Sequence, residues 1–299
     1  MRSYKYSTVN VAITKAIILI KDILFKPVVV NACLHYSYGH LVHRNWGDDI
    51  NYFFLKELFN RHITPLFFSS VAMRKHLPNY LCIGSSITLQ CTSDTIIWGG
   101  GVIDPSANLP AIPKKVLAVR GPLTRKYLLE HNIQCPEVYG DPALLISLYY
   151  KPQIKKKYKL GIIPHYDDFY NPILDKLKKN PDILWIKMEG YKDWKDVLDQ
   201  INSCETIASS SLHGLIMAEA YGIPNLWIEI GGKLLGGHFK FHDFFLSLGE
   251  DRLRPFSINV NTHLNDILIS AMEPHQINCL QSSLIGTCPF SISDGFKIE

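Results

Sequence analysis

A serine-rich turn that ends in histidine is the segment of this chain best suited to chemistry. Ser209-Ser210-Ser211-Leu212-His213-Gly214 comes directly before an apolar stretch at residues 215–224. Serine hydroxyls and free backbone N–H groups at the positive end of a helix dipole bind phosphate or carboxylate. His213 would stand at the helix mouth, where an imidazole holds or transfers a proton near neutral pH. The alternative is an ordinary serine cap beside a surface histidine.

Three further basic residues could meet an anionic substrate. Arg120 follows a short strand, and guanidinium binds carboxylate or phosphate through two parallel hydrogen bonds, although a salt bridge to a nearby helix is the alternative. His165 follows Pro164 at a strand end and could bind phosphate or carry a proton, or be a satisfied loop histidine. Lys240 could add positive charge with Asp243 fixing its position, or the two form a solvated pair.

The loop Asn45-Trp46-Gly47-Asp48-Asp49 supplies carboxylates. We expect one of Asp48 and Asp49 to cap the helix that follows at residues 50–60, and the other to accept a proton from an attacking hydroxyl. The side chain of Asn45 could form a hydrogen bond with the donor substrate or with the acceptor substrate. Gly100 and Gly101 belong to a triple glycine, which lets the backbone approach a ligand or another backbone closely.

The elements that must position these residues alternate between short β-branched runs and helical stretches, which is the α/β pattern. The predicted strands are 27–33, 94–98, 116–119, 159–163, 183–187, 205–208 and 225–230. The predicted helices are 50–60, 123–131, 193–203 and 213–221, and Asp141-Pro142 predicts the capped start of a short helix. The polar loops at 44–49, 99–104, 120–122, 164–168 and 209–213 fall at strand ends, where ligands bind in such folds.

A polar, basic connection at residues 149–158 predicts a domain boundary. With 299 residues, the chain has room for two domains of ordinary size. We expect an α/β domain over residues 1–150, a second α/β domain over 151–250, and a helical segment over 251–299 that could return to the first. Their strand-end loops would then face each other across a cleft.

Taken in order, these motifs resemble the polysaccharide pyruvyl transferase family. The residues that carry the resemblance are 45–49, the triple glycine 99–101, Val119-Arg120-Gly121-Pro122-Leu123-Thr124, Gly140-Asp141-Pro142-Ala143, Ile163-Pro164-His165-Tyr166, 209–224 and Lys240-Phe241-His242-Asp243-Phe244. Each motif alone is weak, but the ordered set, over about residues 28 to 250, is fairly specific.

The resemblance implies two Rossmann-like domains in a GT-B-like arrangement, with the acceptor on the first domain and the donor on the second. It implies phosphoenolpyruvate as donor, transfer of pyruvate as a cyclic ketal across two hydroxyls of one sugar, and a role in exopolysaccharide, capsule or cell-surface glycan biosynthesis. On this basis we expect His213 to donate the proton and Asp48 or Asp49 to be the base. We expect phosphoenolpyruvate to be bound by Arg120, His165, Ser210, Ser211, Leu212, His213 and Lys240. No cofactor or metal is expected.

One position departs from part of that family. Some members carry arginine two places before the histidine of the serine turn, and that arginine binds the donor; here Ser211 stands at this place. The sequence resembles the serine-bearing branch, so donor charge must be met elsewhere. Two alternatives remain open: a GT-B glycosyltransferase that uses a nucleotide sugar, and a non-catalytic sugar-binding protein on the same fold.

Composition narrows the class of protein. A hydrophobic content of 47% with 19% charged residues is typical of a globular chain, and a net charge of +4 is too small to indicate nucleic acid binding. The 7 cysteines include no C-x-x-C pair, which disfavours a zinc site or a disulfide framework.

The N-terminal run 11–25 is apolar but interrupted by lysines, and too short to cross a bilayer. We expect a helix packed on the body, or alternatively one at a membrane surface. We therefore expect a cytoplasmic protein, with a sugar acceptor that could be a lipid-linked oligosaccharide and contact with the inner face of the membrane as a further option.

Overall fold

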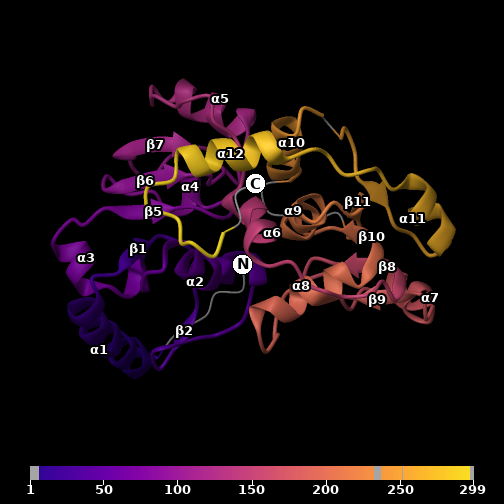
Figure 1. Ribbon diagram of the computed structural model, residues 1–299, viewed down its shortest axis with the longest axis horizontal. Coiled ribbons are helices and arrows are strands. Elements are labelled where there is room, and N and C mark those ends of the chain that lie inside the picture. Colours follow the sequence, from indigo (N-terminus) through magenta and orange to yellow (C-terminus); the bar gives the residue numbers. More distant parts are fainter. Residues whose placement is uncertain (1–6, 232–236, 251, 297–299) are drawn as a thin grey trace.

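Two parallel β-sheets of five strands each form the centre of the molecule (Figure 1). The computed structural model describes residues 7–231, 237–250 and 252–296. The predicted α/β class is confirmed, because helices connect the parallel strands in both sheets. The first sheet has the order β4-β1-β5-β6-β7 and the second the order β12-β11-β10-β8-β9.

The strands are short and mostly buried. Those of the first sheet are β1 (Val28–Val30), β4 (Ile63–Pro65), β5 (Asn79–Leu81), β6 (Thr95–Trp98) and β7 (Lys115–Ala118). Those of the second are β8 (Tyr158–Ile163), β9 (Ile183–Trp185), β10 (Cys204–Ser209), β11 (Asn225–Glu229) and β12 (Phe256–Ser257). A small antiparallel pair, β2 (Tyr36–Ser37) and β3 (His40–Leu41), lies outside both sheets.

The helices surround both sheets. They are α1 (Thr8–Phe25), α2 (Trp46–Phe59), α3 (Ser70–Arg74), α4 (Ile87–Gln90), α5 (Pro122–Glu130), α6 (Ile146–Tyr149), α7 (Asp175–Lys178), α8 (Trp194–Asn202), α9 (Leu212–Ala220), α10 (Phe239–Ser247), α11 (Leu264–Ser270) and α12 (Asn278–Gly286), with 3-10 turns η1 (Leu66–Phe68), η2 (Pro142–Leu145) and η3 (Pro172–Leu174). None of the helices in the described part of the chain is long and apolar enough to cross a membrane.

One apolar core joins the two halves of the chain. It includes Trp46 and Phe54 of α2, Trp194 of α8 and Leu215 of α9. The indole Nε1 of Trp46 also donates a hydrogen bond to the carbonyl of Trp194 at 2.7 Å. Because α2 follows the first sheet's β1 whereas α8 and α9 flank the second sheet's β10, this packing fixes the two sheets against each other.

The C-terminal segment packs on the first half of the chain. The indole of Trp98 on β6 donates to the carbonyl of Leu284 on α12 at 3.1 Å, and the backbone N–H of Ser293 donates to the carbonyl of Leu58 at 2.9 Å. In Figure 1 the yellow α12 lies beside the magenta strands of the first sheet. The division into domains at residues 150 and 250 stays a prediction.

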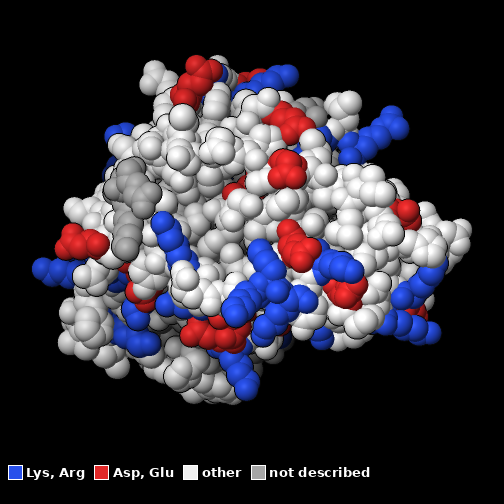
Figure 2. All heavy atoms as spheres, turned by 45° about the vertical axis from the view of Figure 1, so that its right-hand side comes forward, with Lys and Arg blue, Asp and Glu red and all other residues white. Residues whose placement is uncertain are grey.

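Charge is mixed on the surface. Figure 2 shows basic side chains gathered in the lower half of one face, with acidic side chains beside them. This agrees with a chain of 31 basic and 27 acidic residues, in which neither sign dominates.

Candidate active site

The site is built where the first turns of α2 and α9 meet. A Cβ atom added to Gly47 of α2 would lie 2.1 Å from Nδ1 of His213 on α9, so the two helices touch at these residues. The helix α2 begins earlier than predicted, because Asn45 and not an aspartate caps it: its side-chain oxygen accepts from the N–H of Gly47 at 3.2 Å. The expected capping role of Asp48 or Asp49 is therefore wrong, and both lie within the first turn.

Asp48 is held by the capping residue. The amide Nδ2 of Asn45 donates to its Oδ2 at 2.7 Å. Burial raises the pKa of Asp48 to about 7, the charge of Asp49 acts in the same direction, and Asn45 and the ammonium of Lys240 oppose the rise. A carboxyl with this pKa exchanges its proton at neutral pH, which is what a general acid or base requires.

Asp49 is fully buried beside an aromatic hydroxyl. The hydroxyl of Tyr191 donates to its Oδ2 at 2.6 Å, and its Oδ1 has no hydrogen-bond partner in the described part of the chain. Burial raises the pKa of Asp49 to about 7, although the hydrogen bond from Tyr191 opposes this. Asp49 thus faces inward, whereas Asp48 is only half-buried, which favours Asp48 for contact with a substrate.

His213 is neutral in this environment. Burial lowers its pKa to about 3, and the nearby charges of Lys240 and Arg120 act in the same direction. Its Nε2 is enclosed, and within the described residues no group hydrogen-bonds to it. An anionic ligand beside Lys240 would offset the positive field and raise the proton affinity of the ring.

Arg120 is completely buried in an ion pair. Its Nη2 lies 3.0 Å from Oδ2 of Asp243 on α10, and its Nε donates to the same oxygen at 3.1 Å. The guanidinium also donates to the hydroxyl of Ser85 and to the carbonyl of Val102. Direct contact with a donor would require one of these partners to be exchanged; that contact stays a prediction.

Lys240 lies on the first turn of α10 and connects the site electrostatically. Burial lowers the pKa of its ammonium to about 8, Arg120 acts in the same direction, and Asp48 opposes both. Its charge in turn lowers the pKa of His165 and His213. The sequence pattern pairs Lys240 with Asp243, but the carboxylate of Asp243 instead binds Arg120.

His165 and the serine turn lie side by side at the ends of β8 and β10. The backbone N–H of His165 donates to Oγ of Ser210 at 2.8 Å. Burial lowers the pKa of His165 to about 4. Ser211 is the N-cap residue of α9, and its side chain makes no capping hydrogen bond, so the first N–H groups of the helix at Leu212 and His213 are not capped by it. Of the three serines, only Ser209 is tied wholly into the turn, with its hydroxyl donating to the carbonyl of Ser211 at 2.7 Å.

The triple glycine allows the close approaches that the sequence predicts. A Cβ at Gly101 would lie 2.3 Å from Cζ of Arg120, and one at Gly99, whose φ is +86°, would lie 2.2 Å from the ring of Pro142. A Cβ at Gly100 would lie 3.5 Å from the carbonyl oxygen of Leu81, which is ordinary contact. Gly101 therefore admits the buried guanidinium of Arg120 and Gly99 admits the ring of Pro142, whereas Gly100 makes no such close approach.

Sequence patterns do not reveal two residues of the site. Ser85 binds Arg120, and Tyr191 binds Asp49. Ser85 follows Gly84 after β5, so the Gly-Ser pair at a strand end is the signal that could have found it. Tyr191 lies in a loop with no distinctive pattern, and nothing local marks it.

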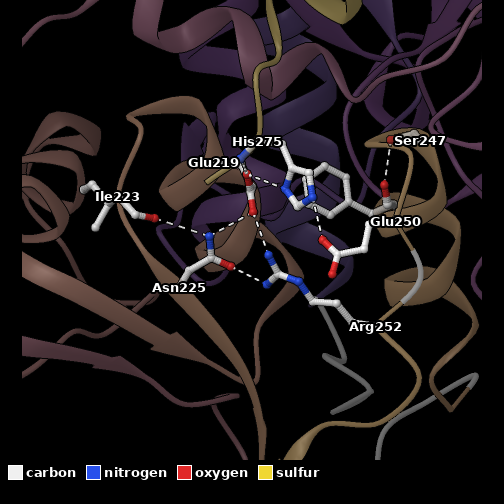
Figure 3. Close-up of polar contacts among 8 residues, drawn as sticks. Glu219, Ile223, Asn225, Ser247, Glu250, Arg252 and His275 are labelled. Carbon is white, nitrogen blue, oxygen red and sulfur yellow. Dashed lines mark hydrogen bonds and ion pairs between the residues drawn. The ribbon is translucent and has the colours of Figure 1, made fainter. Parts of the chain in front are cut away.

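The far end of α9 is anchored by a buried polar network (Figure 3). Glu219, wholly buried, accepts from Nη2 of Arg252 at 3.0 Å and from Nδ2 of Asn225 at 2.9 Å through the same oxygen. Its other oxygen accepts from the backbone N–H of His275 at 2.7 Å, and the ring of His275 also contacts Glu250 at 2.6 Å. The helix that carries His213 is thereby fixed at its C-terminal end.

The fold and site together define an α/β protein in which cations, a helix N-terminus and two carboxyls that titrate near neutrality converge at the ends of parallel strands. This arrangement suits an anionic substrate and proton transfer. The chain belongs to the polysaccharide pyruvyl transferase family, whose model matches residues 19–232. Membership supports a transferase that acts in polysaccharide pyruvylation.

Two known proteins are similar in sequence to this chain. An uncharacterized protein of Acanthamoeba polyphaga mimivirus is 29% identical over 213 residues, which are 70% of this chain and 72% of that protein. The succinoglycan biosynthesis protein ExoV of Rhizobium meliloti (strain 1021) is 27% identical over 247 residues, 78% of this chain and 71% of its own. No solved structure gives a significant match.

Proposed function

We propose that this chain transfers pyruvate from phosphoenolpyruvate to a sugar, where it forms a cyclic ketal across two hydroxyls and phosphate is released. The observation that carries the proposal is the position of Lys240. Its ammonium acts on the pKa of Asp48, His165 and His213, which come from α2, the loop after β8, and α9. One cation among groups that hold and release protons suits a substrate with a phosphate, a carboxylate and a reactive enol ether.

The donor would bind between the two halves of a GT-B-like pair of Rossmann-like domains. Its phosphate and carboxylate would lie against Lys240 and the first turn of α9, with hydrogen bonds from Ser210, Ser211 and the backbone N–H of Leu212. His165 would border the phosphate. Arg120 would act through its charge and through Asp243, which holds α10 and therefore Lys240 in place.

The reaction needs one proton delivered and two accepted. A proton added to the methylene carbon of phosphoenolpyruvate turns it into a methyl group and builds positive charge at C2. A sugar hydroxyl attacks C2 and loses its proton to a base. The bond from C2 to the phosphate oxygen then breaks and phosphate leaves. The second hydroxyl attacks C2 and closes the ring, and its proton passes to the departing phosphate.

His213 and Asp48 are the groups we assign to these steps. His213 is neutral before the donor arrives, and the negative charge of the donor raises its proton affinity so that it can deliver the proton. Asp48 takes up the proton of the attacking hydroxyl, since its pKa of about 7 permits both states. Asn45, which holds Asp48, borders the acceptor sugar, for which a lipid-linked oligosaccharide is our proposal.

Phosphate release from phosphoenolpyruvate, measured over a panel of acceptor sugars, tests the proposal. With a productive acceptor, His213→Ala should lower the rate by about 100-fold or more, in the range of a lost general acid. His76→Ala is the matched control, because the side chain of His76 is 78% exposed and pairs with Asp94, a residue outside the site. Wild-type release by His213→Ala would show that His213 is not the proton donor.

Ligand binding separates this function from that of a nucleotide-sugar glycosyltransferase. Phosphoenolpyruvate should raise the melting temperature of the chain, because it binds only the folded state, and uridine diphosphate should not. The opposite result would favour the glycosyltransferase. A chain that binds sugar but neither of these ligands would instead be a binding protein.

A further inference from the structure

In the helix α1, polar side chains face the body of the protein and most apolar side chains face solvent. This is the reverse of an ordinary surface helix. Three polar side chains, Asn10, Thr14 and Asp22, face the body and hydrogen-bond to it. Their partners are the backbone N–H groups of Tyr38 at 2.8 Å and Gly39 at 3.1 Å, and the hydroxyls of Thr64 at 2.7 Å and Ser69 at 2.6 Å. The helix is thus held in place by polar contacts together with one buried apolar side chain, Ile18, which is 3% exposed.

The outward face of α1 is apolar along its whole length. Val9, Ile20, Ile23 and Leu24 are between 60% and 70% exposed, and Ile13 is 39% exposed. At 100° per residue these positions fall on one side of the helix, together with the exposed Ala12 and Ala16. Over 18 residues the apolar stripe is about 27 Å long. Figure 1 shows α1 at the lower left edge of the molecule.

Neighbouring elements enlarge this surface. The short turns η1 and α3 contact α1, and they expose Phe67 by 62% and Met73 by 43%. Exposed apolar side chains gathered on one part of a protein surface mark a place of interaction.

Positive charge borders the apolar stripe. Lys15 and Lys21 are half-buried and lie about 120° apart on the half of the helix that faces the body, each about 60° from the nearest end of the stripe, and the exposed Lys26 follows the last turn. Arg74 and Lys75 are exposed at the end of α3. The single acidic residue of α1, Asp22, has both carboxylate oxygens occupied by hydroxyls of the body.

We propose that this face, which we call the α1 face, docks on a lipid bilayer that contains anionic headgroups. The apolar stripe would enter the boundary between headgroups and acyl chains, with the helix in the plane of the surface, and the exposed Lys26, Arg74 and Lys75 would contact the lipid phosphates. A second copy of the chain fits less well, because a symmetric contact would place the lysines of one copy against those of the other. The inference concerns a surface apart from the active site and does not depend on the proposed reaction.

Vesicle flotation tests the proposal with the unmodified chain and no substrate. Vesicles of phosphatidylcholine with phosphatidylglycerol should carry the protein to the top of the gradient, and vesicles of phosphatidylcholine alone should carry much less. Ile20→Glu together with Ile23→Glu should lower the partition coefficient by roughly 100-fold, from the lost transfer of two largely exposed isoleucines. Because both side chains point to solvent, the variant should keep the melting temperature of the wild type.

The control variant carries the same change elsewhere. Val260→Glu with Ile269→Glu replaces residues that are 62% and 85% exposed outside α1, and it should float like the wild type. Equal flotation of the α1 variant, or equal capture by the two kinds of vesicle, overturns the proposal. A wild type that ignores vesicles but forms a dimer that the α1 variant disrupts overturns it as well, and makes the α1 face an interface between copies.

Discussion

Replacing Gly47 with alanine tests whether the meeting of α2 and α9 positions His213 for chemistry. The new Cβ would lie 2.1 Å from Nδ1 and 2.6 Å from Cγ of His213, whereas ordinary contact begins at 3.4 Å. The imidazole must therefore retreat by about 1.3 Å, the difference between 3.4 and 2.1 Å. A displacement of about 1 Å of a reacting group lowers rates by roughly 100-fold.

Two effects on the stability of this variant oppose each other: the overlap with the His213 ring costs about 1–3 kcal/mol, and the helix propensity of alanine offsets part of that cost. Gly47 has no positive φ, and alanine within a helix is favoured over glycine by about 1 kcal/mol. The expected result is thus a folded protein with an unchanged or lowered urea midpoint and a phosphate-release rate lowered by about 100-fold. Gly286→Ala is the matched control, since a Cβ there meets nothing within 4 Å. If Gly47→Ala is as active as the wild type, the placement of His213 against α2 has no part in the reaction.

Two further substitutions probe the buried charges. Asp243→Asn leaves the Arg120 guanidinium buried without its counter-charge and should lower the free energy of unfolding by about 3–5 kcal/mol in urea titration; a loss below about 1 kcal/mol, the range of an exposed pair, would contradict the ion pair. Asp49→Asn should flatten the pH dependence of stability. Because the pKa of Asp49 is raised from 3.8 to about 7, the folded state keeps a proton that the unfolded state releases, so the contribution of Asp49 to stability is lost as the pH rises through this window. The wild type should therefore lose stability relative to Asp49→Asn between these pH values, and parallel curves would refute the raised pKa.

Seven of the strands and the helices α1, α2, α5, α8 and α9 follow from local pattern, whereas strands such as β4, β5 and β12 are not predicted by it. Buried β-branched runs predict β1, β6, β7, β8, β10 and β11 within a few residues, because short hydrophobic runs between polar turns suit strands buried on both faces. The predicted capped turn at Asp141 is confirmed, with its Oδ1 accepting from the N–H of Ala143 at 3.0 Å. The helix α2 begins at Trp46, ahead of the predicted residue 50, since Asn45 and the aspartates are all good caps and the sequence does not say which side chain reaches the helix.

Contacts between residues that are far apart in the chain could not be predicted from the sequence. Lys240 and Asp243 are three residues apart on one helix, a spacing that suggests a pair. The fold instead turns Asp243 toward Arg120, from which it is separated by 123 positions, and toward Thr124. A local pattern reports which residues share a helix face, but it cannot report which distant element that face meets.

The orientation of α1 on the body of the protein could not be predicted from the sequence either. Its sequence alternates polar and apolar residues in a way that a packed helix would satisfy by turning its isoleucines inward. The fold turns Asn10, Thr14 and Asp22 inward, because backbone N–H groups of the β2–β3 turn and hydroxyls of Thr64 and Ser69 need acceptors at that position. Burying those unpaired donors under isoleucine would cost about 1–3 kcal/mol each, comparable to the gain from burying an isoleucine. The satisfied polar contacts thus decide the orientation, and the apolar stripe is left for a partner outside the chain.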